Sequence, residues 1–209
     1  MKQKEILFFG DSIFVGQGHS IYNGWLTRLA KDIEDSNEKY LVINSSVNGR
    51  TSRQALEDMP YATNNLNIDS IIIQFGLNDC NHWVTDHGLP RVSPEAFQAN
   101  ILEIVSRAKA MGIKKIIVNN NHPTNVGVLR NLNIDYDDWS RKYNQLIRDI
   151  YQNSKNDIYF NDIEKKINKS MVKNNYLIKD LLMDDGLHLS ATGHDLYYEI
   201  QKEFLEKII

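Results

Sequence analysis

The feature that most constrains this chain is an uninterrupted apolar run over residues 6–9 that stops abruptly at Gly10, Asp11 and Ser12. A strand with one face in water alternates apolar and polar residues, whereas a strand buried on both faces is apolar throughout. We therefore expect residues 5–9 to form a buried parallel strand. Parallel sheets bind ligands beyond the carboxyl ends of their strands, so Ser12 is expected at the mouth of a functional crevice.

Later segments of the chain have the same apolar character, and helical patterns separate them. The predicted strands are Tyr40 to Ile43, Asp69 to Phe75, Lys114 to Val118 and Asp157 to Phe160. One helix is well marked, with Ser93 as its capping residue, Pro94 in its first turn, an apolar face that extends to Ala108, and Gly112 as the residue that can end it. This alternation predicts a parallel sheet with helices on both faces. A length of 209 residues suits one domain, which we assign to residues 1–209.

Charge, hydropathy and cysteine content exclude several classes of protein. The chain has 24 basic and 27 acidic residues, a formal net charge of -3 and no long run of one sign, so no nucleic-acid partner is expected. No segment approaches the ~18 apolar residues of a membrane span, and the first apolar run is too short for a signal peptide. The single Cys80 excludes an intramolecular disulfide and fits a cytoplasmic location. The pattern does not indicate an oligomeric state.

Polar motifs follow four of the predicted strands. They are Gly10-Asp11-Ser12, Asn48-Gly49, Gly76-Leu77-Asn78-Asp79 and Asn121-His122. Because the carboxyl ends of parallel strands meet at one edge of the sheet, we expect the four motifs to gather there. Two longer polar loops, 80–92 and 120–137, are expected around the same edge. The second shows no periodicity, and loops of that length are usually functional or mobile.

A serine nucleophile needs a base to accept its proton and a third group to orient that base. Of the six histidines in the chain, His188 has the best placed acidic neighbour, because Asp185 lies three residues before it. Asp184 competes for the same role at a spacing of four. The developing oxyanion needs hydrogen-bond donors, and the amides of Ser12 and Gly49 with the side chain of Asn78 can supply three.

The order of these motifs resembles that of a known enzyme family. Gly10-Asp11-Ser12-Ile13, Gly49, Gly76-Leu77-Asn78-Asp79 and Asp185-Gly186-Leu187-His188 look like the four sequence blocks of the SGNH hydrolases, also called GDSL esterases and lipases. The resemblance extends from residue 6 to about residue 200. It implies a flavodoxin-like three-layer α/β/α sandwich with a central parallel sheet of about five strands.

The same resemblance implies a role for each matched residue. Ser12 matches the family's nucleophile, His188 its general base and Asp185 the acid that orients the base. Gly49 and Asn78, with the amide of Ser12, match its oxyanion-hole donors. The implied reaction is attack on an ester carbonyl, formation of an acyl-enzyme and hydrolysis. No metal or organic cofactor is required.

Three further side chains are candidates for contact with substrate, and each has an alternative interpretation. Asp11 suits a turn-stabilising role better than acid catalysis. Trp83 is either a platform for substrate or a cover for the core. His122 either touches substrate or stabilises the His-Pro turn. A metal site at His82 and His87 is not expected, because nothing in the sequence fixes their geometry.

The composition of the two long loops favours one class of substrate. They are rich in Asn, Asp, His and Thr, which suits a small ester with a hydroxylated partner better than a long acyl chain. We expect hydrolysis of an O-acetyl ester of a carbohydrate or another polar metabolite. Lysophospholipase, acyl-thioesterase and acyltransferase activities, and a catalytically silent carbohydrate-binding module, remain alternatives. A phosphate-binding role for Gly16-Gln17-Gly18 is disfavoured because the P-loop lysine is missing.

Overall fold

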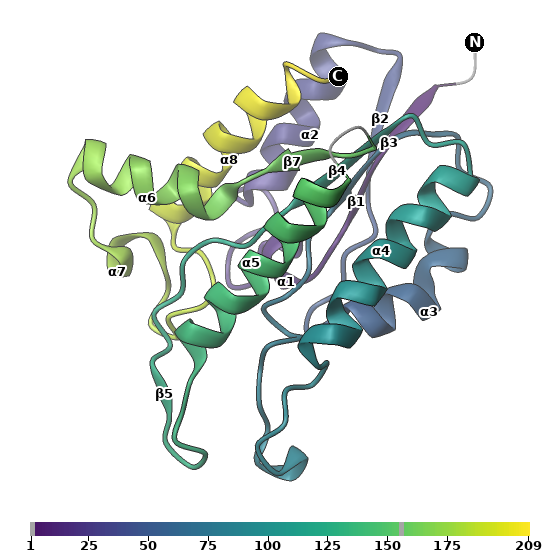
Figure 1. Cartoon of the computed structure of the whole chain (residues 1–209). Coiled ribbons are helices and arrows are strands. Elements are labelled where there is room, and N and C mark those ends of the chain that lie inside the picture. The colour runs from purple at the N-terminus through teal and green to yellow at the C-terminus, as the bar shows by residue number, and fades with distance from the viewer. Residues whose placement is uncertain (1–2, 155–156) are drawn as a thin grey trace.

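A five-stranded parallel sheet between two layers of helices forms the centre of the computed structural model, which describes residues 3–154 and 157–209 (Figure 1). The strands are β1 (Lys4–Phe9), β2 (Tyr40–Asn44), β3 (Ile68–Ile73), β4 (Lys115–Asn119) and β7 (Tyr159–Asn161). They lie in the order β2-β1-β3-β4-β7, and all neighbours are parallel. This order is that of flavodoxin, and it confirms the predicted three-layer fold.

The long helices divide between the two faces of the sheet. One face is covered by α2 (Trp25–Ser36), α6 (Ile163–Asn174) and α8 (Ala191–Leu205), and the other by α3 (Ser52–Ala62), α4 (Pro94–Ala110) and α5 (Tyr136–Asn153). Shorter elements are α1 (Ser12–Val15), α7 (Ile178–Leu181), the 3-10 turn η1 (Val84–Asp86) and the hairpin β5 (Val128–Leu129) with β6 (Ile134–Asp135).

The apolar run in β1 is explained by the two cores that it separates. Leu7 and Phe9 point into the core under α3, α4 and α5, whereas Ile6 and Phe8 point into the core under α2, α6 and α8. All four side chains are fully buried. Successive side chains of a strand face opposite ways, so a strand covered on both faces has no position left for a polar residue.

The structure corrects the end of the third strand and the content of the second long loop. β3 stops at Ile73, two residues before the predicted end at Phe75. Gln74 there turns its side chain to accept hydrogen bonds from Asn119 and from the hydroxyl of Tyr197. The loop predicted over 120–137 contains the β5–β6 hairpin, and α5 begins inside it at Tyr136.

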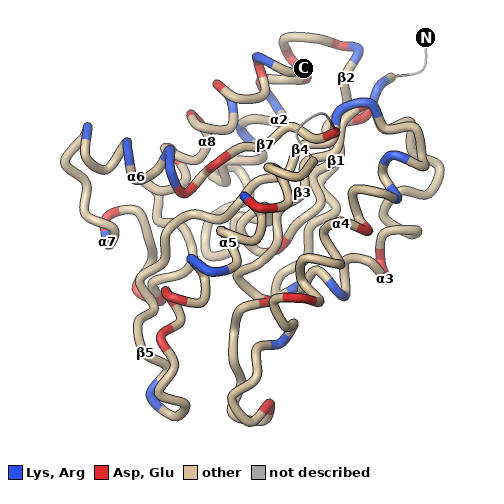
Figure 2. The backbone as a smooth tube through the Cα atoms, in the orientation of Figure 1, with Lys and Arg blue, Asp and Glu red and all other residues tan. Residues whose placement is uncertain are grey.

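Basic and acidic residues are interspersed along the backbone rather than collected in one region (Figure 2). In residues 3–154 and 157–209, no helix combines the length and the apolar character needed to cross a bilayer.

The loop containing η1 and the β5–β6 hairpin project from the same end of the molecule, the end toward which β1 runs (Figure 1).

Candidate active site

Ser12 sits in a tightly packed turn between β1 and the short helix α1. Asp11 caps that helix, because its Oδ1 accepts a hydrogen bond from the amide of Ile13 at 3.0 Å. Ser12 is the first helical residue, and it is 6% exposed. β1 and β3 are the neighbouring strands from which the chain proceeds in opposite directions, so the turn lies at the topological switch point, where doubly wound sheets bind their ligands.

His188 connects Ser12 to Asp185. Its Nε2 lies 3.0 Å from Oγ of Ser12, and its Nδ1 lies 2.6 Å from Oδ2 of Asp185. The other carboxylate oxygen of Asp185 accepts hydrogen bonds from the amides of Leu187 and His188, each at 2.9 Å. Partial burial acts to raise the pKa of Asp185, but these three hydrogen bonds outweigh it and hold the pKa below the usual value. The carboxylate is therefore ionised and fixed beside the imidazole.

The loop that contains Asp185 is supported from the neighbouring 122–125 segment. The Nε2 of His122 donates to the carbonyl of Leu187 at 2.8 Å, and the amide of Asn125 donates to the carbonyl of Gly186, also at 2.8 Å. A side chain at Gly186 would meet the Asn125 carbonyl at 2.2 Å, and its φ is +68°. Glycine is thus required at this position.

The oxyanion-donor candidates, Gly49 and Asn78, are both tied to the Ser12 turn. The Asn78 side-chain amide donates to Oδ2 of Asp11 at 3.3 Å. The amide of Val47, in the turn that contains Gly49, donates to the carbonyl of Gly10 at 3.2 Å. These contacts bring three of the motifs identified in the sequence to one edge of the sheet.

Two buried carboxyl groups lie beneath this edge. Burial raises the pKa of Asp11 to about 7, assisted by the nearby Asp79, and burial raises the pKa of Asp79 to about 6. Asp79 has a structural partner, because its Oδ1 accepts hydrogen bonds from the amide and hydroxyl of Ser52 at 2.9 and 2.5 Å. It thereby links the loop after β3 to the start of α3.

The three candidates for substrate contact differ in exposure. Asp11 and His122 are each 1% exposed and make the internal hydrogen bonds described above, which favours their structural interpretation. Burial lowers the pKa of His122 to about 4, consistent with a neutral ring that donates to a carbonyl. Trp83 is 49% exposed and lines a pocket of about 500 Å³. His82, considered above as a metal ligand, is buried edge-on against Trp139, with ring centroids 4.6 Å apart.

Two side chains that organise the loops were not identified from the sequence. Arg91 donates to the carbonyl of Gly49 and stacks on Trp83. Asp137 accepts hydrogen bonds from the hydroxyl of Thr124 and from the amides of Val126 and Gly127, and so fixes the start of the second long loop. A single carboxylate followed by a predicted helix is too common a pattern to have revealed this role.

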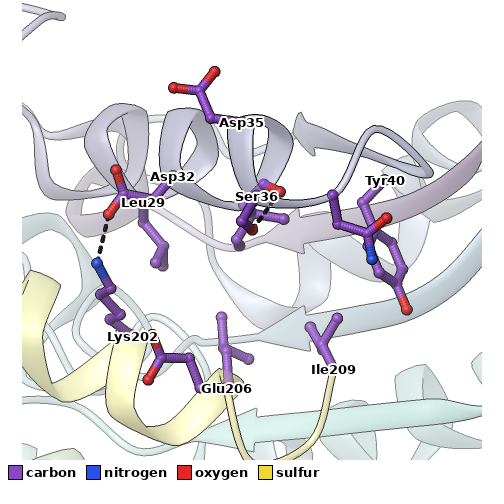
Figure 3. A pocket seen from close by; sticks show the side chains of 11 residues that line it. Leu29, Asp32, Asp35, Ser36, Tyr40, Lys202, Glu206 and Ile209 are labelled. Carbon is purple, nitrogen blue, oxygen red and sulfur yellow. Dashed lines mark hydrogen bonds and ion pairs between the residues drawn. The ribbon is translucent and has the colours of Figure 1, made fainter.

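A further groove lies between α2 and α8, near the amino ends of the strands, whereas Ser12 lies beyond their carboxyl ends. It has a volume of about 560 Å³ and contains Tyr40, which begins β2, whereas Ser12 follows the end of β1. Figure 3 shows its walls, with the ion pair between Asp32 and Lys202 at 2.7 Å. None of the site residues predicted from the sequence lines it.

Comparison with known proteins places these observations in a family. The sequence model of the GDSL-like Lipase/Acylhydrolase family matches residues 8–196. Esterase TesA of Pseudomonas aeruginosa is 30% identical over 122 residues, which are 58% of this chain and 57% of that protein. This chain therefore aligns with little more than half the length of that relative. An arylesterase of Vibrio mimicus is 23% identical over 189 residues, covering 88% of this chain and 80% of its own.

Solved structures share the fold. The acetyl xylan esterase AlAXEase has a TM-score of 0.77 at 19% identity, covering 98% of this chain and 100% of its own. A lipase/acylhydrolase from Enterococcus faecalis has a TM-score of 0.73, also at 19% identity, covering 98% of this chain and 96% of its own. The match of the family model extends over most of the sequence and contains all four motifs. The chain therefore belongs to the GDSL-like lipase/acylhydrolase family and, as a member of it, to the ester hydrolases.

Proposed function

We propose that this protein hydrolyses short-chain esters, specifically O-acetyl esters of a carbohydrate or another polar metabolite, with Ser12, His188 and Asp185 as its catalytic triad. The observation that carries the proposal is the position of His188, whose two ring nitrogens lie 3.0 Å from Oγ of Ser12 and 2.6 Å from Oδ2 of Asp185. A serine hydroxyl becomes a useful nucleophile at neutral pH when a base in this position takes its proton. The proposal includes one catalytic domain and a cytoplasmic location.

In the acylation step, Oγ of Ser12 attacks the ester carbonyl carbon while Nε2 of His188 takes the hydroxyl proton. The ionised Asp185 holds the Nδ1–H tautomer and stabilises the imidazolium. The negative charge that develops on the carbonyl oxygen is stabilised by donors from the amides of Ser12 and Gly49 and from the side chain of Asn78. His188 then protonates the departing alcohol, and the acyl group remains on Ser12.

In the deacylation step, a water molecule takes the place of the alcohol. His188 removes one of its protons as the oxygen attacks the acyl carbon, and the tetrahedral intermediate collapses to a carboxylic acid. His188 returns the proton to Oγ of Ser12, which restores the enzyme. Neither step requires a metal or an organic cofactor.

The preference for a small, polar ester rests on the loops around the site. The pocket beside Trp83 combines polar side chains with the indole and two apolar residues, a mixture that suits the polar edge and apolar face of a hydroxylated ring. Its lining consists of Arg53, Trp83, Asp86, Leu89, Pro90, Arg91 and Ser93. Acetyl xylan esterases are among the proteins that share the fold, which agrees with this preference. A relative is named thioesterase and lysophospholipase, so esters with longer acyl chains are the competing class of substrate.

The test compares p-nitrophenyl acetate, butyrate and octanoate as substrates of the wild type and of Ser12→Ala, His188→Ala and Asp185→Asn. We expect acetate to be cleaved fastest. Each of the first two substitutions should lower kcat by at least about 10⁴-fold, and Asp185→Asn by about 10³ to 10⁴-fold because the imidazole loses its orienting carboxylate. Circular dichroism and thermal melting check that each variant is folded.

Asp184→Asn is the matched control for the acid, since this neighbouring residue is exposed and, among the described residues, forms no hydrogen bond or ion pair with His188. It should keep kcat within about twofold of the wild type. Loss of activity in Asp184→Asn but not in Asp185→Asn would overturn the assignment of the acid. Octanoate cleaved faster than acetate would instead favour a lysophospholipase or thioesterase. Transfer to an added alcohol in excess of free acid would indicate an acyltransferase, and ligand binding without turnover a silent module.

A further inference from the structure

Arg91 connects an exposed aromatic surface to the turn that contains Gly49. Its Nη1 donates to the carbonyl of Gly49 at 3.1 Å, and its guanidinium carbon lies 4.3 Å from the centre of the Trp83 ring. The backbone of Arg91 is fixed at the base of the 80–92 loop, because its amide donates to the carbonyl of Asn81 at 2.9 Å. One side chain thus contacts both the loop and the proposed oxyanion donor.

The conformation of this turn decides where the Gly49 amide points. The amide of Arg50 donates to the carbonyl of Val47 at 3.2 Å, which closes a four-residue turn, and Gly49 is its third residue with a φ of +74°. These values describe a type II turn. The Gly49 N–H belongs to the central peptide unit, and a change to a type I turn would reverse that unit and turn the N–H away.

Packing does little to hold Gly49 in this conformation. A Cβ placed on Gly49 would have no heavy atom within 4 Å outside its immediate neighbours in the chain. The turn is held instead by hydrogen bonds. Arg50 donates to the carbonyl of Ser45 at 2.6 Å, at the base of the loop, and Arg91 donates to Gly49 itself. Of these two arginine side chains, only that of Arg91 donates a hydrogen bond to Gly49 itself, at its carbonyl oxygen.

We propose that Arg91 is a positioning residue, which holds the Gly49 amide toward the oxyanion and couples it to the ring of the leaving alcohol bound against Trp83. This inference rests on the proposed function, because it requires Gly49 to be an oxyanion donor. The pocket of about 500 Å³ that Trp83 and Arg91 share with Arg53 and Asp86 has the size and polarity for one sugar ring. A ring stacked on the indole would confine Arg91 in its hydrogen-bonded position.

The experiment measures kcat and KM for p-nitrophenyl acetate and the Ki of phenylboronic acid, which forms a tetrahedral adduct with an active serine. Arg91→Met keeps the length of the side chain and removes its donors. We expect about a tenfold lower kcat, a KM within about twofold of the wild type and a Ki raised by about the same factor as kcat falls. Arg91→Lys keeps one donor and should restore most of kcat.

Arg107→Met is the matched control, because Arg107 also donates to a main-chain carbonyl, that of Leu56 at 3.2 Å, but does so at α3 away from the 80–92 loop. It should leave the Ki unchanged. A folded Arg91→Met enzyme with kcat and Ki within about twofold of the wild type would overturn the proposal, as would a loss expressed only in KM. Should Arg91→Met not fold, Arg91→Leu, which also removes the donors, carries the same comparison.

Failure of this inference and failure of the proposed function give different results. If Ser12→Ala retains the activity of the wild type, the triad itself is wrong. If Ser12→Ala is inactive while Arg91→Met behaves as the wild type in both kcat and Ki, the triad stands and only the role of Arg91 is refuted.

Discussion

The Ser12 turn and the Gly49 turn lie at the same edge of the sheet, but different forces hold them. The Ser12 turn is fixed by packing. A Cβ on Gly10 would lie 2.8 Å from Cδ2 of Phe14 and 3.0 Å from the carbonyl of Gln74, and Asp11 is buried beneath it. The Gly49 turn has open space around its glycine and is held by hydrogen bonds from arginine side chains.

Substitutions in the two turns should therefore affect different properties of the protein. Packing in a protein interior leaves little room to adjust, so changes near Ser12 should first alter the free energy of unfolding. Hydrogen bonds at a half-exposed turn contribute modestly to stability but select one conformation, so changes near Gly49 should first alter kcat. The proposed nucleophile is placed by the core, and the proposed oxyanion donor is placed by hydrogen bonds from the side chains of Arg50 and Arg91.

In the packed Ser12 turn, the largest effect on stability should come from the buried carboxyl group of Asp11. The pKa of Asp11 is raised by burial from its usual 3.8 to about 7, so between these values the folded protein binds a proton that the unfolded chain releases. This contribution to the free energy of unfolding is fully present below pH about 4 and is lost as the pH rises through 7, up to about 4 kcal/mol in all. Urea unfolding of the wild type and Asp11→Asn from pH 4 to 8 should show the variant gaining stability relative to the wild type.

The comparison between the two proteins at each pH cancels the other carboxyl groups, several of which act in the opposite direction. Asp184→Asn serves as the control for the loss of an exposed carboxyl group. A stability difference between Asp11→Asn and the wild type that does not change with pH would show that the Asp11 carboxyl group is better solvated than its burial implies.

A methyl group at Gly10 should destabilise the packed Ser12 turn. Gly10→Ala places an atom within contact distance of both the Phe14 ring and a main-chain carbonyl, and overpacking of this kind costs about 1–3 kcal/mol. Thermal unfolding should show a Tm lowered by roughly 3–10 °C for a chain of this size. An unchanged Tm would mean that the Phe14 ring moves aside freely and that packing does not fix the turn.

The corresponding change at Gly49 should have the smallest effect on stability. Gly49→Ala meets no neighbouring atom, but alanine at a φ of +74° is strained by about 1 kcal/mol. We expect a Tm shift smaller than that of Gly10→Ala and a reduction of kcat of less than about tenfold, because Arg91 keeps the turn in place. A double substitution with Arg91→Met should lower kcat by more than the product of the two single effects.

The sequence predicted the sheet well because buried parallel strands have long apolar runs. The motifs after β1 and β3 were interpretable for a related reason, since Ser12 and Asn78 each follow such a run directly. The β5–β6 hairpin could not be predicted, because strands of two residues are too short to have a periodicity.

The supporting contacts of the site could not be predicted from the sequence either. Arg91 and Gly49 are 42 residues apart, and His122 and Leu187 are 65 residues apart. Contacts of this kind depend on how the loops pack, and no local pattern marks them. His122 shows the limit clearly, since a histidine after a strand suits a substrate contact or a buried support equally well, and only its burial favours the second role.

Ser12, which begins α1, and His188, which lies between α7 and α8, are 176 residues apart, and this separation has a consequence during synthesis. A ribosome adds roughly 5–20 residues per second, so the proposed nucleophile exists for roughly 10–35 s before its proposed base has been made. The nascent chain therefore has a nucleophilic residue without the means to activate it. Reactivity should begin only when the histidine loop reaches the sheet, which makes ester cleavage a sensitive reporter of completed folding.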